Sequence, residues 1–451
     1  MELDIVGLVG ACSYALDCIE AELVHVTNRH GKRVAYISVC MAERLGIEGS
    51  ALQDLAICAM LHDNALTQYI SEEIQENNIS NISLGGSTQG DKNTIVDSGG
   101  MSNESESIIS ENGMAYSPEI IKSIVGSIHK KIGLHCTYGE QNIKKLPFYT
   151  DVSGAVLYHH ENADGTGTFG KRWDEIPLFA RIIHLCDMVD VMGNSCDFSG
   201  ESWIRAKEYV CRNRNILFDS ECADAFLEVF SEENFVSMSQ DRFEDELWKK
   251  IPRDKRDCDF ETCKGIADFF AGIVDYKSEF TGKHSLGVAK KAAELAEYMG
   301  YSQADIEKFY MAGALHDIGK MAIGNEILEK PGRLTDEEFS RMKNHAGYTY
   351  MILSEVKDFD EVRDWAALHH EKLDGTGYPF GKKAEELNEP ERLMACVDIY
   401  QALTEARPYK SGMSHDKACS ILEDMVQKGW IDAAVTDKLR SCFDVGGRDM
   451  V

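Results

Sequence analysis

The chain carries one series of histidine and aspartate residues twice, and this repeat limits its fold more than any other feature of the sequence. The interval from His30 to His62 is the same as that from His284 to His316. Both His62 and His316 are followed directly by an aspartate. Because a repeat that extends over several such positions corresponds to a whole structural unit rather than to one helix, the sequence predicts one fold built twice.

The later positions of the two series also agree. In each series, a histidine is followed at the same interval by a His-His-Glu triplet and then by Asp-Gly-Thr-Gly. An aspartate ends each series, and its distance from the triplet differs by one residue between the two. In chain order these positions are His135, His159-His160-Glu161, 164–167 and Asp187 in the first series, and His345, His369-His370-Glu371, 374–377 and Asp398 in the second. The source of the difference is visible, because Gly-Tyr-Pro-Phe-Gly-Lys at 377–382 corresponds to Gly-Thr-Phe-Gly-Lys at 167–171.

The segments between these positions have the periodicity of helices. Apolar residues of 284–300 recur at helical spacing, and the segment stops at a glycine, which is a common signal for a helix end. The segment 30–46 has the same length and the same ends. Alternating β-branched residues are scarce, and only 8 prolines interrupt the chain. The sequence therefore predicts an all-α fold made of two tandem helical bundle domains.

At 451 residues the chain is long enough for two hydrophobic cores. We expect residues 1–240 to form the first domain, the charged stretch 241–259 to connect the two, and residues 260–451 to form the second domain. The first copy is longer because of an insertion around 71–115, which is rich in Ser, Asn and Gly. This composition predicts a disordered surface loop.

The net charge of −29 argues against a nucleic-acid polymer as partner, because the phosphate backbone would be repelled. A small anionic ligand remains compatible with this charge, since a local basic pocket can hold one. The apolar run 5–16 is short and leads into Asp17 and Glu20, so it is neither a signal peptide nor a membrane span. We therefore expect a cytoplasmic protein without a membrane segment, and we assign no function to its 14 cysteines.

Ten of the 14 histidines fall at positions of the repeat. A lone helical histidine is usually structural, but five in each copy, joined by two aspartates, exceed what structure alone requires. Imidazoles and carboxylates are ligands that iron, manganese and related divalent ions use. Seven ligands are too many for one ion, so two divalent ions are predicted, which together would activate a water molecule. In the second copy the candidate ligands are His284, His316, Asp317, His345, His369, His370 and Asp398.

Residues 284–410 resemble an HD-GYP domain, an all-helical branch of the HD phosphohydrolase superfamily. The matching motifs are His316-Asp317-Ile318-Gly319-Lys320, His345, His369-His370-Glu371, Asp374-Gly375-Thr376-Gly377-Tyr378-Pro379, and Asp398 with Arg407-Pro408-Tyr409. The resemblance implies a metal-dependent phosphodiesterase that hydrolyses cyclic di-GMP to the linear dinucleotide or on to GMP.

The resemblance also implies a centre of two, sometimes three, metal ions. The first ion would be held by His284, His316, Asp317 and Asp398. The second would be held by Asp317, His345, His369 and His370. Some members hold a third ion through a glutamate four residues before the first histidine. Phe280 stands at that position here, so we expect two divalent ions, iron or manganese.

Basic residues and a loop complete this predicted site. Lys320 lies one helical turn beyond His316 and can neutralise charge on the phosphate, so Asp317 and Lys320 are the expected catalytic residues. Arg407 and Lys410 resemble the phosphate-contacting pair of the family, and the Gly-Tyr-Pro loop would lie near the substrate. The expected substrate-binding residues are thus Gly377, Tyr378, Pro379, Arg407 and Lys410.

The first copy keeps every candidate ligand but loses the cations. Its possible second metal site consists of His30, His62, Asp63, His135, His159, His160 and Asp187. Leu66, Cys196 and Ser199 take the places of Lys320, Arg407 and Lys410. We expect this copy to bind metal but to hydrolyse cyclic dinucleotides poorly or not at all. It could instead regulate, sense metal, act on a less charged substrate, or serve only as a packing partner.

Two further readings remain open from the sequence. The substrate could be cyclic GMP-AMP or another nucleotide, because the motifs locate a phosphate but not the bases. Alternatively, the chain could be a signalling module that senses metal or ligand and passes this state to protein partners in second-messenger signalling. The complete set of catalytic residues in the second copy favours an enzyme.

Overall fold

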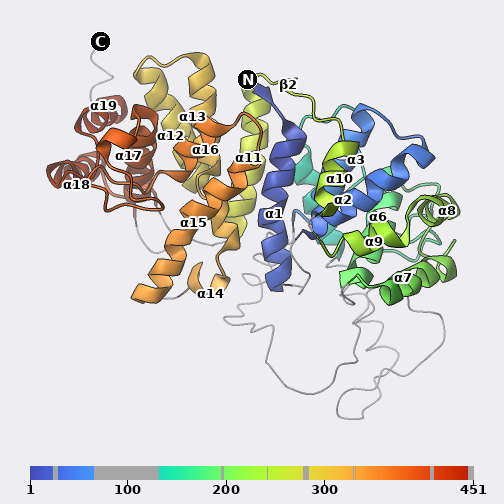
Figure 1. Ribbon diagram of the computed structural model, residues 1–451. Helices are drawn as coiled ribbons and strands as arrows, with labels where there is room; N and C mark the ends of the chain where they lie inside the picture. Colours follow the sequence, from blue (N-terminus) through green and yellow to red (C-terminus); the bar gives the residue numbers. More distant parts are fainter. Residues whose placement is uncertain are drawn as a thin grey trace. The chain divides into compact units, whose positions relative to one another are not determined.

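The structure, a computed structural model, describes residues 1–23, 29–65, 132–194, 198–240, 242–277, 284–328, 330, 332–406 and 411–444 (Figure 1). Helices dominate these residues, and the only strands among them are β1 (Glu2–Leu3) and β2 (Arg256–Asp257). The prediction of an all-α fold is therefore confirmed. The insertion around 71–115 and the predicted phosphate-contacting pair Arg407 and Lys410 lie outside the described residues.

Two compact units make up the chain. The C-terminal unit consists of residues 1–22, 144–147 and 253–451, and the N-terminal unit of residues 23–143 and 148–252. This division differs from the predicted one because it places residues 1–22 and 144–147 in the C-terminal unit and divides the predicted connector, 241–259, at residue 253. The predicted boundaries themselves remain a prediction.

Polar contacts explain why the first residues belong to the C-terminal unit. β1 pairs antiparallel with β2, and the N-terminal ammonium of Met1 donates a hydrogen bond to the carbonyl of Cys258 at 2.7 Å. The buried carboxylate of Asp4 lies 2.6 Å from the guanidinium of Arg253. A buried carboxylate needs a cation to offset its desolvation, so Arg253 stabilises this placement of Asp4.

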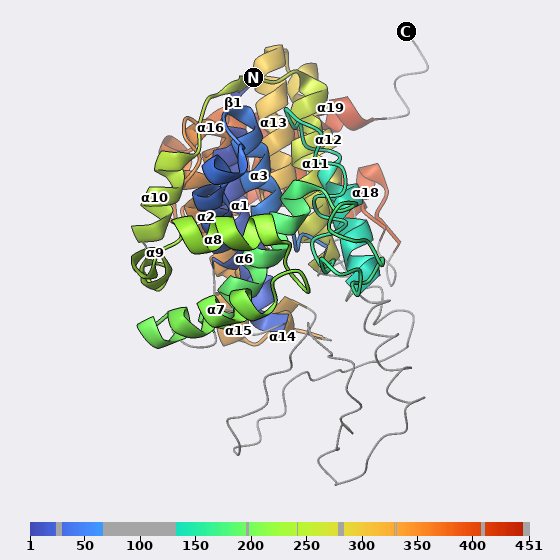
Figure 2. The ribbon, with the colours of Figure 1, turned by 90° about the vertical axis from the view of Figure 1, so that its right-hand side faces the viewer.

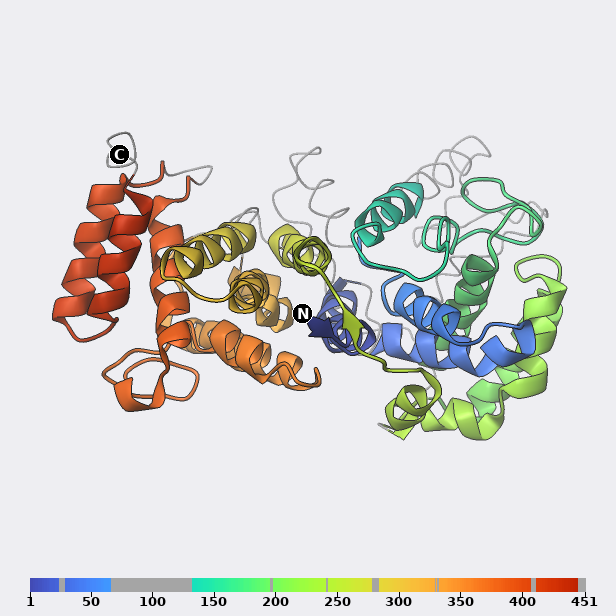
Figure 3. The same cartoon turned by 90° about the horizontal axis from the view of Figure 1, so that it is seen from above.

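In the described part of the C-terminal unit, ten helices and two short 3-10 turns surround the core. They are α1 (Ile5–Leu23), α11 (Phe260–Lys277), α12 (His284–Tyr298), α13 (Gln303–Leu315), η2 (Ile318–Ala322), α14 (Asn325–Leu328), α15 (Asp336–Ser354), α16 (Asp360–Ala367), η3 (Ala384–Glu386), α17 (Glu389–Thr404), α18 (His415–Gln427) and α19 (Ala433–Phe443). α12 packs on α13 and α17, and α17, α18 and α19 pack on one another (Figure 3). Side chains such as Leu295 and Phe309 are fully buried between them.

Capping residues in the sequence determine where two of these helices begin. Thr335 and Glu338 form a reciprocal capping box at the start of α15, and Asn388 and Glu391 form one at the start of α17. Each box satisfies backbone N–H groups that the first helical turn leaves without an intrahelical partner. Both helices carry predicted metal ligands, so their start points set where those ligands lie.

The N-terminal unit repeats this arrangement. Its elements are α2 (His30–Ala42), η1 (Glu43–Leu45), α3 (Ser50–Met60), a helix over 132–143, α6 (Leu178–Asn194), α7 (Gly200–Arg212), α8 (Ser220–Val229), α9 (Glu232–Ser237) and α10 (Arg242–Lys250) (Figure 2). α2 packs on α3 and α6, as α12 packs on α13 and α17. α10, which the sequence placed in the connector, packs against α2. The repeat seen in the sequence thus corresponds to one helical arrangement formed twice.

No helix in the described part of the chain is both long and apolar enough to cross a membrane.

Candidate metal centres

Five separate elements of the C-terminal unit bring its seven predicted ligands together. His284 begins α12, the His316-Asp317 pair follows α13, His345 lies within α15, the His369-His370 pair follows α16, and Asp398 lies within α17. All of these side chains are buried except that of His370, which is partly exposed. The adjacent histidines can both face the site because α16 ends at Ala367, before them, so helical geometry does not force their rings apart.

One group of ligands gathers around Asp398. Its Oδ1 atom lies 3.0 Å from Nε2 of His284 and 3.7 Å from Nε2 of His316. The potential ligand atoms of these three residues all lie within 4.8 Å of one another. This spacing suits a single cation between them.

A second group consists of His345, His369 and His370, whose ligand atoms also lie within 4.8 Å of one another. Asp317 lies between the two groups. Its Oδ2 is 3.1 Å from Nε2 of His316, and its Oδ1 is 3.5 Å from Nε2 of His345. A carboxylate placed in this way can contribute one oxygen to each group.

Backbone carbonyls orient the imidazoles in both groups. The Nδ1 atoms of His316, His345 and His369 lie 2.6–2.8 Å from carbonyl oxygens three residues earlier in the chain. Their buried Nε2 atoms have no hydrogen-bond partner among the described residues, and neither has Oδ1 of Asp317. Buried polar atoms without partners are costly, so this cluster of inward-facing donor atoms fits bound metal ions.

At His369, His370 and Asp317 the electrostatics favour the protonation states that metal ions require. Burial and the neighbouring rings of His370 and His316 hold the pKa of His369 well below its ordinary value, and burial lowers the pKa of His370 to about 3. Burial alone would raise the pKa of Asp317, but His316 and Lys320 hold it well below its ordinary value. Neutral imidazoles and an ionised carboxylate are the forms that bind cations. Burial would lower the pKa of His284, but hydrogen bonds to Asp398 and Glu405 raise it to about 10 in the absence of an ion.

Lys320, predicted as catalytic, lies at this centre. Its ammonium is 2.5 Å from Oδ2 of Asp317, and its side chain is 22% exposed. It is therefore partly open to a ligand while it neutralises a carboxylate of the metal centre. Glu405, for which no role was predicted, lies 3.0 Å from Nδ1 of His284. It is the C-cap of α17, two helical turns beyond Asp398, and the first copy has Asn194 at the corresponding position, so the repeat gave no signal for it.

Glu371 organises the Gly-Tyr-Pro loop. This buried carboxylate accepts hydrogen bonds from the backbone N–H groups of Phe380, Gly381 and Lys382 at 2.7–3.0 Å. A Cβ added at Gly377 would lie 2.3 Å from the backbone nitrogen of Lys372, so only glycine fits there. The loop consequently presses the Tyr378 ring against His370, with ring centroids 4.7 Å apart. The glutamate of the His-His-Glu triplet was the available signal for this role.

The N-terminal unit assembles its own seven predicted residues in a similar way. Oδ1 of Asp187 lies 3.4 Å from Nε2 of His30. Asp63 occupies the intermediate position, with Oδ2 3.7 Å from Nε2 of His62 and Oδ1 2.9 Å from Nε2 of His135. Nε2 of His159 also lies 3.5 Å from Asp63, and the His160 ring lies beside that of His159, with centroids 4.0 Å apart. This second cluster could also hold cations.

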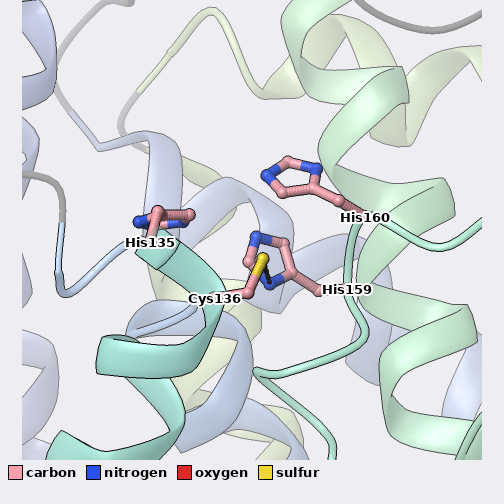
Figure 4. Close-up of side chains that lie close together, drawn as sticks. All are labelled: His135, Cys136, His159 and His160. Carbon is pink, nitrogen blue, oxygen red and sulfur yellow. Dashed lines mark hydrogen bonds between the residues drawn. The ribbon is translucent and has the colours of Figure 1, made fainter. Parts of the chain in front are cut away.

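A cysteine distinguishes this cluster from the C-terminal one. Cys136 is buried, and its sulfur lies 3.9 Å from Nδ1 of His159 (Figure 4). That nitrogen also lies 2.6 Å from the carbonyl of Val156, whereas Nε2 faces Asp63. The thiol therefore contacts the ring nitrogen that does not face Asp63. Ala346 occupies the corresponding position in the other copy.

Arg181 and Arg392 occupy corresponding positions in the two copies. Both stabilise the surrounding fold, and among the described residues neither makes a hydrogen bond or ion pair with the candidate ligands. Arg392 donates hydrogen bonds to the carbonyls of Ala384 and Leu387 and to Asp432, the N-cap of α19. Arg181 lies 3.2 Å from Asp219, the N-cap of α8. The repeat therefore extends beyond the ligands into the frame that supports them.

Comparisons with known proteins agree with this geometry. The sequence pattern of the HD domain family matches residues 127–212 and 268–435. Over 313 residues, 67% of this chain and 72% of the relative, the sequence is 32% identical to the 3'3'-cGAMP-specific phosphodiesterase 1 of Vibrio cholerae serotype O1. It is 40% identical over 167 residues, 34% of each chain, to a cyclic di-GMP phosphodiesterase of the same organism.

A solved structure shares the whole fold. The crystal structure of the cyclic GMP-AMP specific phosphodiesterase V-cGAP3 of V. cholerae matches with a TM-score of 0.62 and 23% sequence identity, covering 99% of this chain and 98% of that chain. The helical fold and the buried clusters of imidazoles and carboxylates define a metal-dependent phosphohydrolase. The chain belongs to the HD domain family, in its HD-GYP branch, as the motifs of its second half indicated.

Proposed function

We propose that the C-terminal unit hydrolyses a phosphodiester bond of a cyclic dinucleotide, with 3'3'-cGAMP as the first candidate and cyclic di-GMP as the second. The position of Asp317 between two histidine groups, with the Lys320 ammonium beside it, supports this proposal most directly. This order of substrates differs from the preference drawn from the motifs. The similarity to a cGAMP-specific relative extends over 67% of the chain, whereas that to a cyclic di-GMP relative covers 34%.

Two divalent ions, iron or manganese, would be held by the ligand groups around Asp398 and His345, and when bound they supply Lewis acidity and activate the attacking water. The protein's own groups perform the remaining tasks. Asp317 would contribute a carboxylate oxygen to each group, and although burial alone would raise its pKa, His316 and Lys320 hold that pKa well below its ordinary value. The ammonium of Lys320 is placed to offset negative charge that develops on the phosphate. The Gly-Tyr-Pro loop, fixed by Glu371, borders the site through Tyr378.

The N-terminal unit, in this proposal, binds metal without hydrolysing cyclic dinucleotides. It keeps the imidazoles and carboxylates, but the sequence places Leu66 where the other copy has Lys320. Without that cation, developing charge on a phosphate would be less well stabilised, which for one electrostatic group costs about 10²–10³ in rate. Among the roles left open by the sequence, we propose a regulatory one for this unit, because it keeps the metal-binding groups but lacks the lysine that corresponds to Lys320.

The test is a product analysis with matched substrates. The metal-loaded protein is incubated with 3'3'-cGAMP, with cyclic di-GMP and with 2'3'-cGAMP, and the products are separated by chromatography. We expect hydrolysis of at least one 3'3'-linked substrate, faster for 3'3'-cGAMP, and loss of turnover after chelation that manganese or ferrous iron restores. Faster turnover of cyclic di-GMP would reverse the order of substrates. Absence of hydrolysis of all three would overturn the function.

A further inference from the structure

The Gly-Tyr-Pro loop lies along one face of α15, and its successive residues approach residues on successive turns of that helix. The ammonium of Lys343 lies 5.8 Å from the centre of the Tyr378 ring, and a Cβ added at Gly347 would lie 3.9 Å from Cβ of Pro379. One turn further, the rings of Tyr350 and Phe380 lie 5.0 Å apart. The loop therefore fixes Tyr378 beside Lys343.

The Tyr378 ring lies between this lysine and the histidines of the metal centre. Its centroid lies 4.7 Å from that of His370 and 6.3 Å from that of His345. The ammonium of Lys343 also lies 5.1 Å from the centre of the Phe339 ring, which is 48% exposed. Lys343 thus stands at the rim of the site, between one ring that borders the metal ligands and one that faces solvent.

The positive charge of Lys343 is not neutralised within the described part of the chain, where no carboxylate oxygen lies within 4.0 Å of its ammonium. Lys320 and Lys330, by contrast, are paired with Asp317 and Glu338 at 2.5–2.6 Å. Among the described residues, its recorded contacts are those with the rings of Phe339 and Tyr378, which attract a cation but leave its N–H groups available. A cation of this kind can bind an anionic ligand without first breaking an ion pair.

The N-terminal copy has neither the cation nor the room for it. Gly133 occupies the corresponding position, two residues before His135. A Cβ there would lie 3.1 Å from Cγ2 of Thr168 and 3.7 Å from Cζ of Phe169. The loop of that copy therefore packs onto the helix where the C-terminal unit presents a lysine. The difference accompanies the loss of the other cations of the site.

We propose that Lys343 binds the second phosphate of a cyclic dinucleotide, the one that is not being cleaved. The inference rests on the proposed function of the same site. A cyclic dinucleotide carries two phosphodiester anions, and only one can lie at the metal centre beside Lys320 during cleavage. The other must leave the centre along its rim, where Lys343 is available for a charge-assisted hydrogen bond. Lys343 therefore selects a dianionic cyclic substrate over a simple monoanionic diester.

The experiment compares two substrates in four proteins: the unaltered chain, Lys343→Gln, Lys343→Arg, and the matched control Lys438→Gln, which removes an exposed lysine on α19. The substrates are 3'3'-cGAMP and the monoanionic diester bis(p-nitrophenyl) phosphate. For Lys343→Gln we expect the ratio of kcat/KM for the cyclic substrate to kcat/KM for the simple diester to fall about tenfold, through KM, as for loss of one charge-assisted contact. Lys343→Arg should recover most of that ratio, and Lys438→Gln should keep it.

Direct binding gives a second readout. The dissociation constant of a phosphorothioate analogue of 3'3'-cGAMP, measured by calorimetry, should rise by about the same factor in Lys343→Gln. Equal losses for both substrates, or an unchanged ratio, would overturn the role of Lys343 while leaving the proposed function intact. If the unaltered chain hydrolyses the simple diester but no cyclic dinucleotide, the proposed function and this inference both fail.

Discussion

Nδ1 of His30 lies 2.7 Å from Oδ2 of Asp190, which is also paired with Arg33 at 2.6 Å. The C-terminal unit has Gln401 at the position of Asp190 and Gly287 at that of Arg33. The two copies therefore orient their first histidine differently. Such outer carboxylates fix the ring and raise the basicity of a metal ligand.

We predict that Asp190→Asn weakens metal binding at the N-terminal centre by about 10–100-fold, the usual effect of removing a carboxylate behind a ligating histidine. Titration of the metal-free protein with manganese, followed by calorimetry, measures this as the loss of one class of sites. The variant also removes the negative charge that pairs with the buried Arg33, so circular dichroism at the titration temperature serves to establish that the variant is folded. Unchanged affinity in a folded variant would contradict a role for Asp190 in orienting His30.

Replacing Lys320 separates its catalytic role from metal binding. In Lys320→Gln we expect kcat for the cyclic dinucleotide to fall by about 10²–10³, because a preorganised cation near the developing charge is lost. Metal content, measured by elemental analysis, should remain that of the unaltered protein, since the ligand side chains are unchanged. Lys330→Gln is the control, because Lys330 is paired with Glu338 on α15. Normal turnover in Lys320→Gln would show that its contact with Asp317 is only structural.

Gly377 tests the fit of the Gly-Tyr-Pro loop. Gly377→Ala places a Cβ 2.3 Å from the nitrogen of Lys372, so the loop must shift, and we expect a loss of about 1–3 kcal/mol in the free energy of unfolding together with reduced turnover. Gly272→Ala is the matched control. It lies in α11 with no atom within 4 Å of its added Cβ, so it should preserve or raise stability by up to about 1 kcal/mol. Chemical denaturation measures both, and equal effects of the two substitutions would contradict the described loop packing.

Metal removal should lower stability as well as activity. The Nε2 atoms of His316, His345 and His369 are buried without partners among the described residues, and so is Nε2 of His159 in the other unit. Because an ion that binds only the folded state stabilises it by mass action, free manganese at 100 times its dissociation constant should add about 2.7 kcal/mol. Thermal unfolding with and without the metal measures this shift. A transition temperature that metal does not change would show that these atoms do not bind it.

The sequence predicted the helical class and the grouping of the ligands because both depend on local patterns. The equal spacings from His30 and His284 reflect helices that recur in the same order, so the positions of Asp63 and Asp317 followed directly. Asp190 and Glu405 could not be found in this way. They contact His30 and His284 from different turns of equivalent segments, and only packing decides which turn supplies the carboxylate.

The contacts of the first residues could not be predicted from the sequence either. Nothing in the pattern around Asp4 indicates Arg253 as its partner, which lies far along the chain. The proposed role of Lys343 could not be inferred from the sequence for another reason. A lysine two residues before His345 resembles any solvated lysine until the loop that ends in Phe380 is placed against α15.

The central claim is that the centre around Asp317 catalyses hydrolysis and the one around Asp63 does not. The most direct measurement is turnover of 3'3'-cGAMP by Asp317→Ala and Asp63→Ala in parallel, with metal content determined on the same samples. We predict that Asp317→Ala abolishes turnover, that Asp63→Ala retains it at least in part, and that each variant loses metal. Turnover that survives in Asp317→Ala and disappears in Asp63→Ala would contradict the claim.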